Sequence, residues 1–289
     1  MEKLSAIEIL SKLVSFPTVS NTSNLKLVEW VENYLLGFGI ESYRKYNADG
    51  DKAALFAHVG PMKEGGVVLS GHTDVVPVEG QNWISDPWVL DEREEKYFGR
   101  GSCDMKGFDA LAIWAMVEAN EKGVTRPLQI ALSYDEEVGC LGAPPMIEEM
   151  LEKLPKASMV IVGEPSTMLA VTGHKGALGI KTHVIGKEVH SSILDRGVSA
   201  IMNSAKLIEW ANSENISNKL KTPSETARLF DPPYTTLHVG TIKGGTAHNI
   251  TSKDCWFEMD VRVVSDEPVE FWSNRYLEKA KEIENEMKK

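Results

Sequence analysis

The sequence predicts an α/β protein with a mostly parallel sheet, followed by a smaller α+β domain. Up to about residue 172, short apolar runs alternate with helical patterns, which is typical of a parallel sheet flanked by helices. After Gly176 the expected order becomes strand, helix, strand, strand, helix, which is a ferredoxin-like unit without its last strand. We therefore expect two domains, residues 1–175 and 176–289.

The first domain is expected to begin with two amphipathic helices and then to alternate strands with helices. Apolar residues recur at helical spacing over 5–15 and 24–37. Strands are expected over 53–59, 66–71, 127–134, 158–162 and 168–172, and further helices over 107–119 and 141–154. Ligand sites in such sheets lie beyond the carboxyl ends of the strands, so polar residues that follow these strands are the first candidates.

The second domain is expected to have fewer and longer elements. These are strands over 177–187, 235–243 and 255–263, with helices over 198–211 and 268–288. The polar stretch 212–234 is expected to be a loop, long enough to contact a ligand.

Composition excludes several classes of protein. The chain has 289 residues and a formal net charge of −11, which argues against a nucleic-acid partner and against binding to a membrane surface. No apolar run approaches membrane-spanning length, and residues 1–10 read as an amphipathic helix instead of a signal peptide. Cys103, Cys140 and Cys255 lie too far apart for a thiolate zinc site or a disulfide framework. We expect a soluble, cytoplasmic protein.

One histidine and several carboxylates follow the ends of predicted strands. They are His72, Asp74, Glu136, Glu137 and Glu164. Taken singly, each has an ordinary explanation, such as a surface histidine or a solvated acidic loop. Taken together, they are the side chains with which a two-metal hydrolase holds zinc and activates water.

The spacing of these residues suggests individual roles. Asp74 lies two residues after His72, on the same side of an extended chain, where it can accept the second ring N–H. Glu136 and Glu137 can divide the work, with one binding metal and the other holding a proton of water. Asp104 precedes an apolar helix, so by spacing alone a helix cap is favoured over a carboxylate that bridges two metals.

Five ordered motifs resemble the zinc aminoacylase/carboxypeptidase family. They are Gly71-His72-Thr73-Asp74-Val75-Val76-Pro77, Gly99-Arg100-Gly101, Asp104-Met105-Lys106-Gly107, Asp135-Glu136-Glu137 and Gly163-Glu164-Pro165-Ser166. The family includes succinyl-diaminopimelate desuccinylase, acetylornithine deacetylase and the glutamate carboxypeptidases, and the motifs here most resemble the acetylornithine deacetylases. The resemblance implies a catalytic zinc-peptidase domain over 1–175 and an inserted lid and dimerisation domain over 176–289.

The resemblance also implies a ligand set for two zinc ions. His72 and Glu164 would bind one ion, Glu137 the other, and Asp104 would bridge them. Oxygen and nitrogen ligands suit Zn²⁺, with Co²⁺ or Mn²⁺ as substitutes in vitro.

The remaining implied roles concern catalysis and substrate binding. Asp74 would orient the histidine, Glu136 would be the general acid/base, and His190 would reach the active site of the other subunit in a homodimer formed through the lid. Asn249 and Arg262 resemble positions that hold the substrate's carboxylate. Taken alone, Asn249 is an ordinary turn residue and Arg262 an ordinary strand-surface residue.

The expected reaction is removal of the acetyl group from N2-acetyl-L-ornithine, a step of arginine biosynthesis. The alternatives are desuccinylation, hydrolysis of another N-acyl amino acid or dipeptide, and a truncated homologue without catalysis. Members of the family continue past the lid and supply a second histidine to the second metal. No histidine follows His248 here, so we expect this chain by itself to be weakly active or inactive.

Overall fold

The computed structural model describes residues 2–288. The chain divides into two compact units, Met1–Leu169 (unit 1) and Ala170–Lys289 (unit 2). The division falls a few residues before the predicted boundary at 175/176. Each unit has its own buried core, and each is described by itself below.

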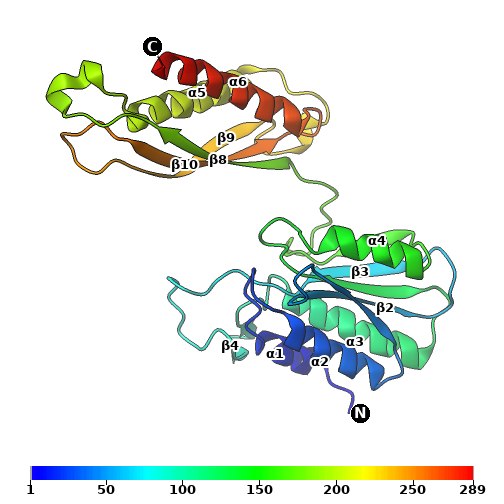
Figure 1. Cartoon of the computed structure of the whole chain (residues 1–289). Helices are drawn as coiled ribbons and strands as arrows, with labels where there is room; N and C mark the ends of the chain where they lie inside the picture. The colour runs from blue at the N-terminus through cyan, green and yellow to red at the C-terminus, as the bar shows by residue number, and fades with distance from the viewer. Residues whose placement is uncertain (1, 289) are drawn as a thin grey trace. The chain divides into compact units, whose positions relative to one another are not determined.

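Unit 1 is a five-stranded sheet with helices on both faces (Figure 1). Its helices are α1 (Ala6–Val14), α2 (Leu25–Leu36), α3 (Lys106–Lys122) and α4 (Ala143–Lys153). The strands of the sheet are β1 (Ser42–Tyr46), β2 (Ala53–Val59), β3 (Val67–His72), β6 (Leu128–Ser133) and β7 (Met159–Val162). A separate hairpin consists of β4 (Asp91–Arg93) and β5 (Lys96–Phe98).

The strand order of the sheet is β1-β2-β6-β3-β7. β3 pairs in parallel with β6 and β7, whereas β2 pairs antiparallel with β1 and β6. Four of the five strands therefore run in one direction, and β2 alone runs in the other. This arrangement confirms the predicted α/β class.

Helices cover the two faces of this sheet with separate cores. α1, α2 and α3 pack on one face, against β2 and β6 residues such as Leu55 and Ile130. On the other face, Met146 and Met150 of α4 pack against Phe56. β2 is buried on both faces, which explains its almost uninterrupted apolar sequence. β7 differs, because its four residues are 44–59% exposed.

Unit 2 is a three-stranded antiparallel sheet, β8-β10-β9, with two helices on one face (Figure 1). Its elements are β8 (Gly176–Ile185), a 3-10 helix (Ser191–Arg196), α5 (Ala200–Leu220), a short 3-10 turn (Ala227–Leu229), β9 (Thr236–Gly244), β10 (Asp254–Val263) and α6 (Val269–Met287). Alternate β10 residues such as Phe257 and Val261 point into the core with Leu207 and Trp272, as expected for a sheet covered on one face.

Two predictions about secondary structure were wrong, one about a strand and one about the end of a helix. Residues 168–172 form no strand; Met168 has a φ of +63° and is almost fully exposed. α5 runs to Leu220 instead of ending at 211, so the predicted loop is shorter. The polar residues of this extra segment bond to the start of β9: Asn215 Nδ2 donates to Leu237 O at 2.7 Å and Asn218 Nδ2 to Thr235 O at 3.0 Å. The sequence pattern also missed β1 and the β4–β5 hairpin.

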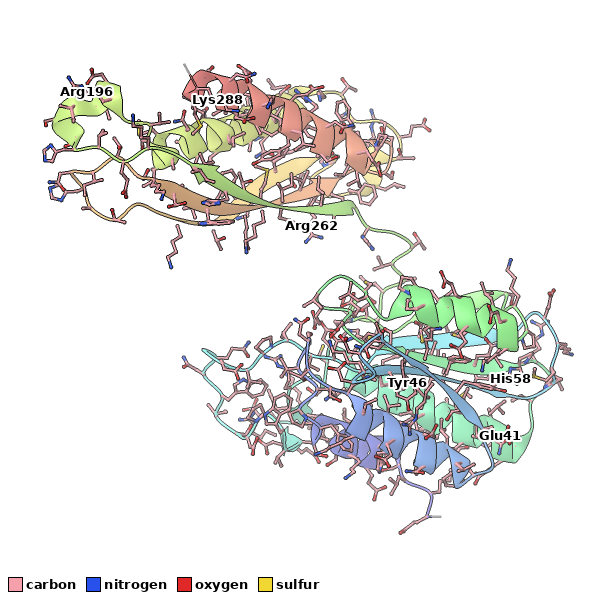
Figure 2. All side chains as sticks on the ribbon, viewed as in Figure 1. Glu41, Tyr46, His58, Arg196, Arg262 and Lys288 are labelled. Atoms are coloured by element: carbon pink, nitrogen blue, oxygen red, sulfur yellow. The ribbon has the colours of Figure 1, made fainter. Side chains whose placement is uncertain are left out.

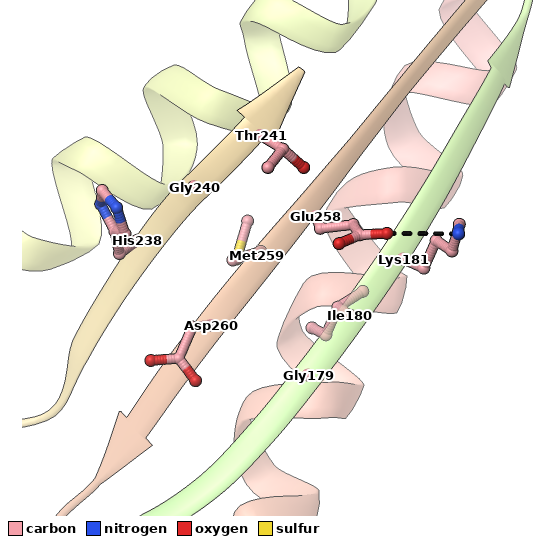
Figure 3. A pocket seen from close by; sticks show the side chains of 9 residues that line it. All are labelled: Gly179, Ile180, Lys181, His238, Gly240, Thr241, Glu258, Met259 and Asp260. Atoms are coloured by element: carbon pink, nitrogen blue, oxygen red, sulfur yellow. Dashed lines mark ion pairs between the residues drawn. The ribbon is translucent and has the colours of Figure 1, made fainter. Parts of the chain in front are cut away.

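The sheet face of unit 2 that the helices leave open carries a shallow hollow of about 410 Å³ (Figure 3). Lys181 of β8 and Glu258 of β10, which both line it, form an ion pair of 3.2 Å. None of the side chains predicted from the sequence for catalysis or metal binding lines this hollow. Among residues 2–288, no helix has the length and apolar character needed to cross a membrane.

Candidate metal centre

The register of the parallel strands brings the predicted ligands together at the carboxyl ends of these strands in unit 1. His72, the last residue of β3, pairs with Ser133, the last residue of β6. On the other side of β3, Ser70 pairs with Val162, so Glu164 lies two residues further, level with His72. The chain after β6 leads directly into Glu136 and Glu137. The polar residues at and after the ends of three neighbouring strands therefore lie close together.

The side chains of these residues converge around His72. Its Nε2 atom lies 3.3 Å from Asp104 Oδ1, 3.7 Å from Glu164 Oε1 and 3.8 Å from Glu136 Oε2. Two groups have potential ligand atoms within 4.8 Å of one another: His72 with Glu136 and Glu164, and His72 with Asp104 and Glu137. The imidazole is 1% exposed, whereas the Asp104 side chain is 47% exposed. The cluster therefore has a buried nitrogen ligand and open oxygen ligands.

Asp74 supports this cluster from the protein interior. His72 Nδ1 lies 2.9 Å from the backbone oxygen of Asp74 and 3.3 Å from its Oδ1. The same carboxylate accepts hydrogen bonds from the backbone N–H of Glu136 at 3.0 Å and from Ser20 Oγ at 2.7 Å. Burial alone would raise the pKa of Asp74, but these hydrogen bonds outweigh burial and lower it. Asp74 thus links the histidine to the acidic loop.

The charges of the cluster favour a bound cation. Burial lowers the pKa of His72, but the hydrogen bond and charge of Asp74 prevail and raise it to about 10. Burial and the neighbouring carboxylate of Asp104 raise the pKa of Glu137 and Glu164. Carboxylates held this close repel one another, and a divalent ion relieves that repulsion. One imidazole with four carboxylates fits Zn²⁺ by ligand type.

Two buried titratable groups near the cluster were not among the predicted site residues. Lys106 and Asp109 lie one helical turn apart on α3, and both are almost fully buried. Lys106 Nζ donates to Phe16 O at 2.7 Å, and burial lowers its pKa to about 7. Burial raises the pKa of Asp109 well above its ordinary value, and its Oδ1 has no hydrogen-bond partner. Charged residues within an apolar helix were the sequence signal that could have found them.

The three residues predicted for unit 2 do not lie together in one copy of the chain. His190 caps the 3-10 helix through its Nδ1, which lies 2.8 Å from Ser192 Oγ. Asn249 is its neighbour, because Ser191 N–H donates to Asn249 O at 2.9 Å. Arg262 lies near the far end of β10, about 26 Å from Asp254 at 3.3 Å per residue, and pairs with Asp260 at 2.8 Å.

Figure 2 shows this separation within unit 2. Arg196, the last residue of the 3-10 helix that follows His190, is labelled at one end of the unit, and Arg262 is labelled well away from it along the sheet. The roles proposed for these residues stay predictions.

Comparison with known sequences places the chain among metal-dependent peptidases. The family model described as "Peptidase family M20/M25/M40" matches residues 68–272. An acetylornithine deacetylase of Pasteurella multocida is 34% identical over 273 residues, covering 91% of this chain and 69% of that protein. An acetylornithine deacetylase of Myxococcus xanthus is 33% identical over 266 residues, covering 90% and 67%. The chain therefore spans about two thirds of the length of these relatives.

Solved structures show the same fold at low sequence identity. An M20 family metallo-carboxypeptidase from Sulfolobus solfataricus superposes with a TM-score of 0.80 at 16% identity, covering 98% of this chain and 76% of that one. A dinuclear metal-binding M20 peptidase from Bacillus subtilis gives a TM-score of 0.61 at 14% identity, covering 98% and 70%. Because the family model matches well over half of the chain and the polar cluster has the expected side chains, the chain belongs to peptidase family M20/M25/M40 and is a hydrolase.

Proposed function

We propose that the chain carries the zinc site and lid of an amidohydrolase that removes the acetyl group from N2-acetyl-L-ornithine, as in arginine biosynthesis. The observation that supports this most is the convergence of Asp104, Glu136, Glu137 and Glu164 on the single imidazole of His72. The relatives named acetylornithine deacetylase support the choice of substrate.

The proposed chemistry assigns separate tasks to the residues of the cluster. When bound, zinc would polarise the amide carbonyl and lower the pKa of water. Glu136 accepts the proton of the attacking water and returns it to the amine nitrogen as the C–N bond breaks, which yields acetate and ornithine. Asp74 fixes the imidazole of His72 and the backbone of Glu136, so that base and ligand keep their relative positions.

In this proposal unit 2 contributes to substrate binding and assembly. His190 would stabilise the oxyanion in the other subunit of a homodimer, where preorganised donors have their largest effect. Asn249 and Arg262 would bind the carboxylate of the substrate, from different subunits if both act at one site, because they lie apart in one chain. Analytical ultracentrifugation should show a dimer at micromolar concentration; a monomer alone would remove His190 from this role.

The test of the proposed function measures bound metal and turnover together. With added zinc, we expect two bound zinc ions per chain and hydrolysis, even if weak, that is faster for acetylornithine than for succinyl-diaminopimelate or dipeptides. Glu136→Gln should lower kcat by about 10²–10⁴-fold, because it removes the general acid/base. Glu148→Gln, an exposed change on α4, is the matched control and should leave kcat unchanged.

Three results would contradict the proposal. Turnover that persists in Glu136→Gln would exclude the general-base role. Faster hydrolysis of another acyl substrate would move the chain to the desuccinylase or dipeptidase alternative. One zinc ion or none, with no turnover, would mark the chain as an incomplete enzyme or a non-catalytic homologue. Zinc content is measured by plasma mass spectrometry on each variant, since Glu136 also lies close enough to His72 to be a ligand.

A further inference from the structure

A buried ion pair lies directly behind the acidic loop of unit 1. Lys52, the residue before β2, is 8% exposed, and Asp135, the residue before Glu136, is 3% exposed. The ammonium group of Lys52 contacts Asp135 Oδ2, and the backbone N–H of Asn21 donates to Asp135 Oδ1 at 2.8 Å. Both oxygens of this carboxylate are therefore held by groups from other parts of the chain.

This contact fixes the chain at an unusual backbone position. Asp135 has a φ of +52°, in the left-handed region that aspartate tolerates better than most residues. The peptide groups that follow point their N–H groups at Asp74, from Glu136 at 3.0 Å and from Glu137 at 3.4 Å. The loop is thus held by Asp135 on one side and by Asp74 on the other.

Lys52 is itself held in place by a turn. Asn47 Oδ1 accepts the N–H of Lys52 at 3.1 Å, and Asn47 N–H donates to Lys52 O at 3.1 Å. Burying a lysine at the start of this strand costs free energy, because an ion pair taken out of water seldom adds stability over apolar side chains. The pair is better explained by what it orients.

We propose that Lys52 is a positioning residue for the metal centre: through Asp135 it holds the Glu136–Glu137 loop at the distance from His72 that metal binding needs. Ligands must be held within about 0.5 Å of their working geometry, and groups that orient ligands typically change metal affinity by about 10–100-fold. The inference rests on the metal site of the proposed function, but not on acetylornithine as its substrate.

Three variants separate positioning from stability and from charge. Lys52→Met removes the tether and leaves a buried carboxylate unpaired. Asp135→Asn keeps the acceptor for Asn21 N–H and tolerates the positive φ. The double variant, Lys52→Met with Asp135→Asn, leaves the net charge unchanged. Lys45→Met is the matched control, because it breaks an ion pair of 3.2 Å with Glu149 on the same unit, away from the cluster.

Each variant is measured for zinc affinity by chelator competition, for thermal unfolding without zinc, and for acetylornithine hydrolysis. We expect Lys52→Met and the double variant to bind zinc at least about tenfold more weakly, and Lys45→Met to stay within about twofold. Removing a positive charge would by itself strengthen cation binding, so weaker binding by Lys52→Met indicates lost positioning. The double variant should recover thermal stability relative to Lys52→Met, because no unpaired charge remains.

Recovered stability together with recovered zinc affinity in the double variant would overturn the inference, since the pair would then be structural only. Wild-type zinc affinity in Lys52→Met would also overturn it. If Lys52→Met does not fold, zinc affinity is compared in the double variant and in Asp135→Asn. Weaker binding supports the inference, and wild-type affinity overturns it. A wild-type chain that binds zinc but does not hydrolyse acetylornithine would leave this inference standing, because the affinities need no substrate.

Discussion

At the scale of single residues, Asp74 does more than the sequence suggested. Its predicted task was to hold the second ring nitrogen of His72, and both its backbone oxygen and its carboxylate lie beside that atom. It also accepts backbone N–H groups from the loop that carries Glu136. One carboxylate therefore fixes a predicted ligand and the proposed base together, and a shift of either would move the other.

Asp109 should make the stability of the metal-free protein depend on pH. Because burial raises its folded-state pKa, its contribution to stability is complete below about 3.8, its unfolded value, and is lost as the pH rises above that. His72 and Lys106 are the nearby cations that partly offset this loss. Asp109→Asn cannot ionise, so it should be more stable than the wild type at pH 8.

Urea unfolding of both proteins at pH 5 and pH 8 checks this prediction. The advantage of the asparagine should be larger at pH 8 than at pH 5. An equal difference at the two values would show that burial does not raise the pKa of Asp109 in the folded protein.

At the scale of elements, the end of β7 is set by its contact with α3. Gly163 follows β7, and a Cβ atom placed on it would lie 1.9 Å from Cγ of Phe108, in the first turn of α3. Gly163 N–H donates to Ser70 O at 3.1 Å, which continues the pairing with β3. A glycine is needed because the aromatic ring occupies the space of a side chain. The next residue is the predicted ligand Glu164.

Gly163→Ala should therefore disturb both packing and metal binding. Overpacking of this kind costs about 1–3 kcal/mol, so the melting temperature should fall, and zinc affinity should fall because Glu164 is displaced. Gly173→Ala, where the added Cβ meets nothing within 4 Å, should have little effect. Combining Gly163→Ala with Phe108→Leu should restore part of the zinc affinity; no recovery would show that the ring is not the obstacle.

At the scale of the whole molecule, the two units have separate cores, and the predicted metal ligands all lie in one of them. The cluster around His72 lies entirely in unit 1, whereas the core built on Phe257 and Trp272 belongs to unit 2. Ligand binding stabilises only the part that folds to make the site. Zinc should therefore stabilise unit 1 against unfolding and leave the stability of unit 2 unchanged.

Differential scanning calorimetry with and without zinc should show two transitions, of which one moves upward. At a zinc concentration of 100 times Kd, the added stability is about 2.7 kcal/mol. Phe257→Leu, a change in the core of unit 2, should lower only the transition that zinc leaves in place. A single transition that responds to both changes would show that the units unfold together.

The sequence by itself determined the fold class, the family and the composition of the polar cluster. Strand periodicity placed β3, β6 and β7, and polar residues after apolar runs identified His72, Glu136 and Glu164, because both signals are local in the chain. β1 was missed because its partly buried residues show no clear alternation. The length of α5 was missed because its polar residues bond to β9, a contact between distant segments.

Only the tertiary structure decided which groups stand behind the site. Lys52 reads as a surface lysine before an apolar strand, and nothing within its neighbours in sequence links it to Asp135, 83 positions away. The burial of Lys106 and Asp109 likewise depends on how α3 packs on the sheet. Local sequence patterns identify the residue types that can bind metal. The charged groups that orient these residues reach them through contacts between distant segments, which no local pattern encodes.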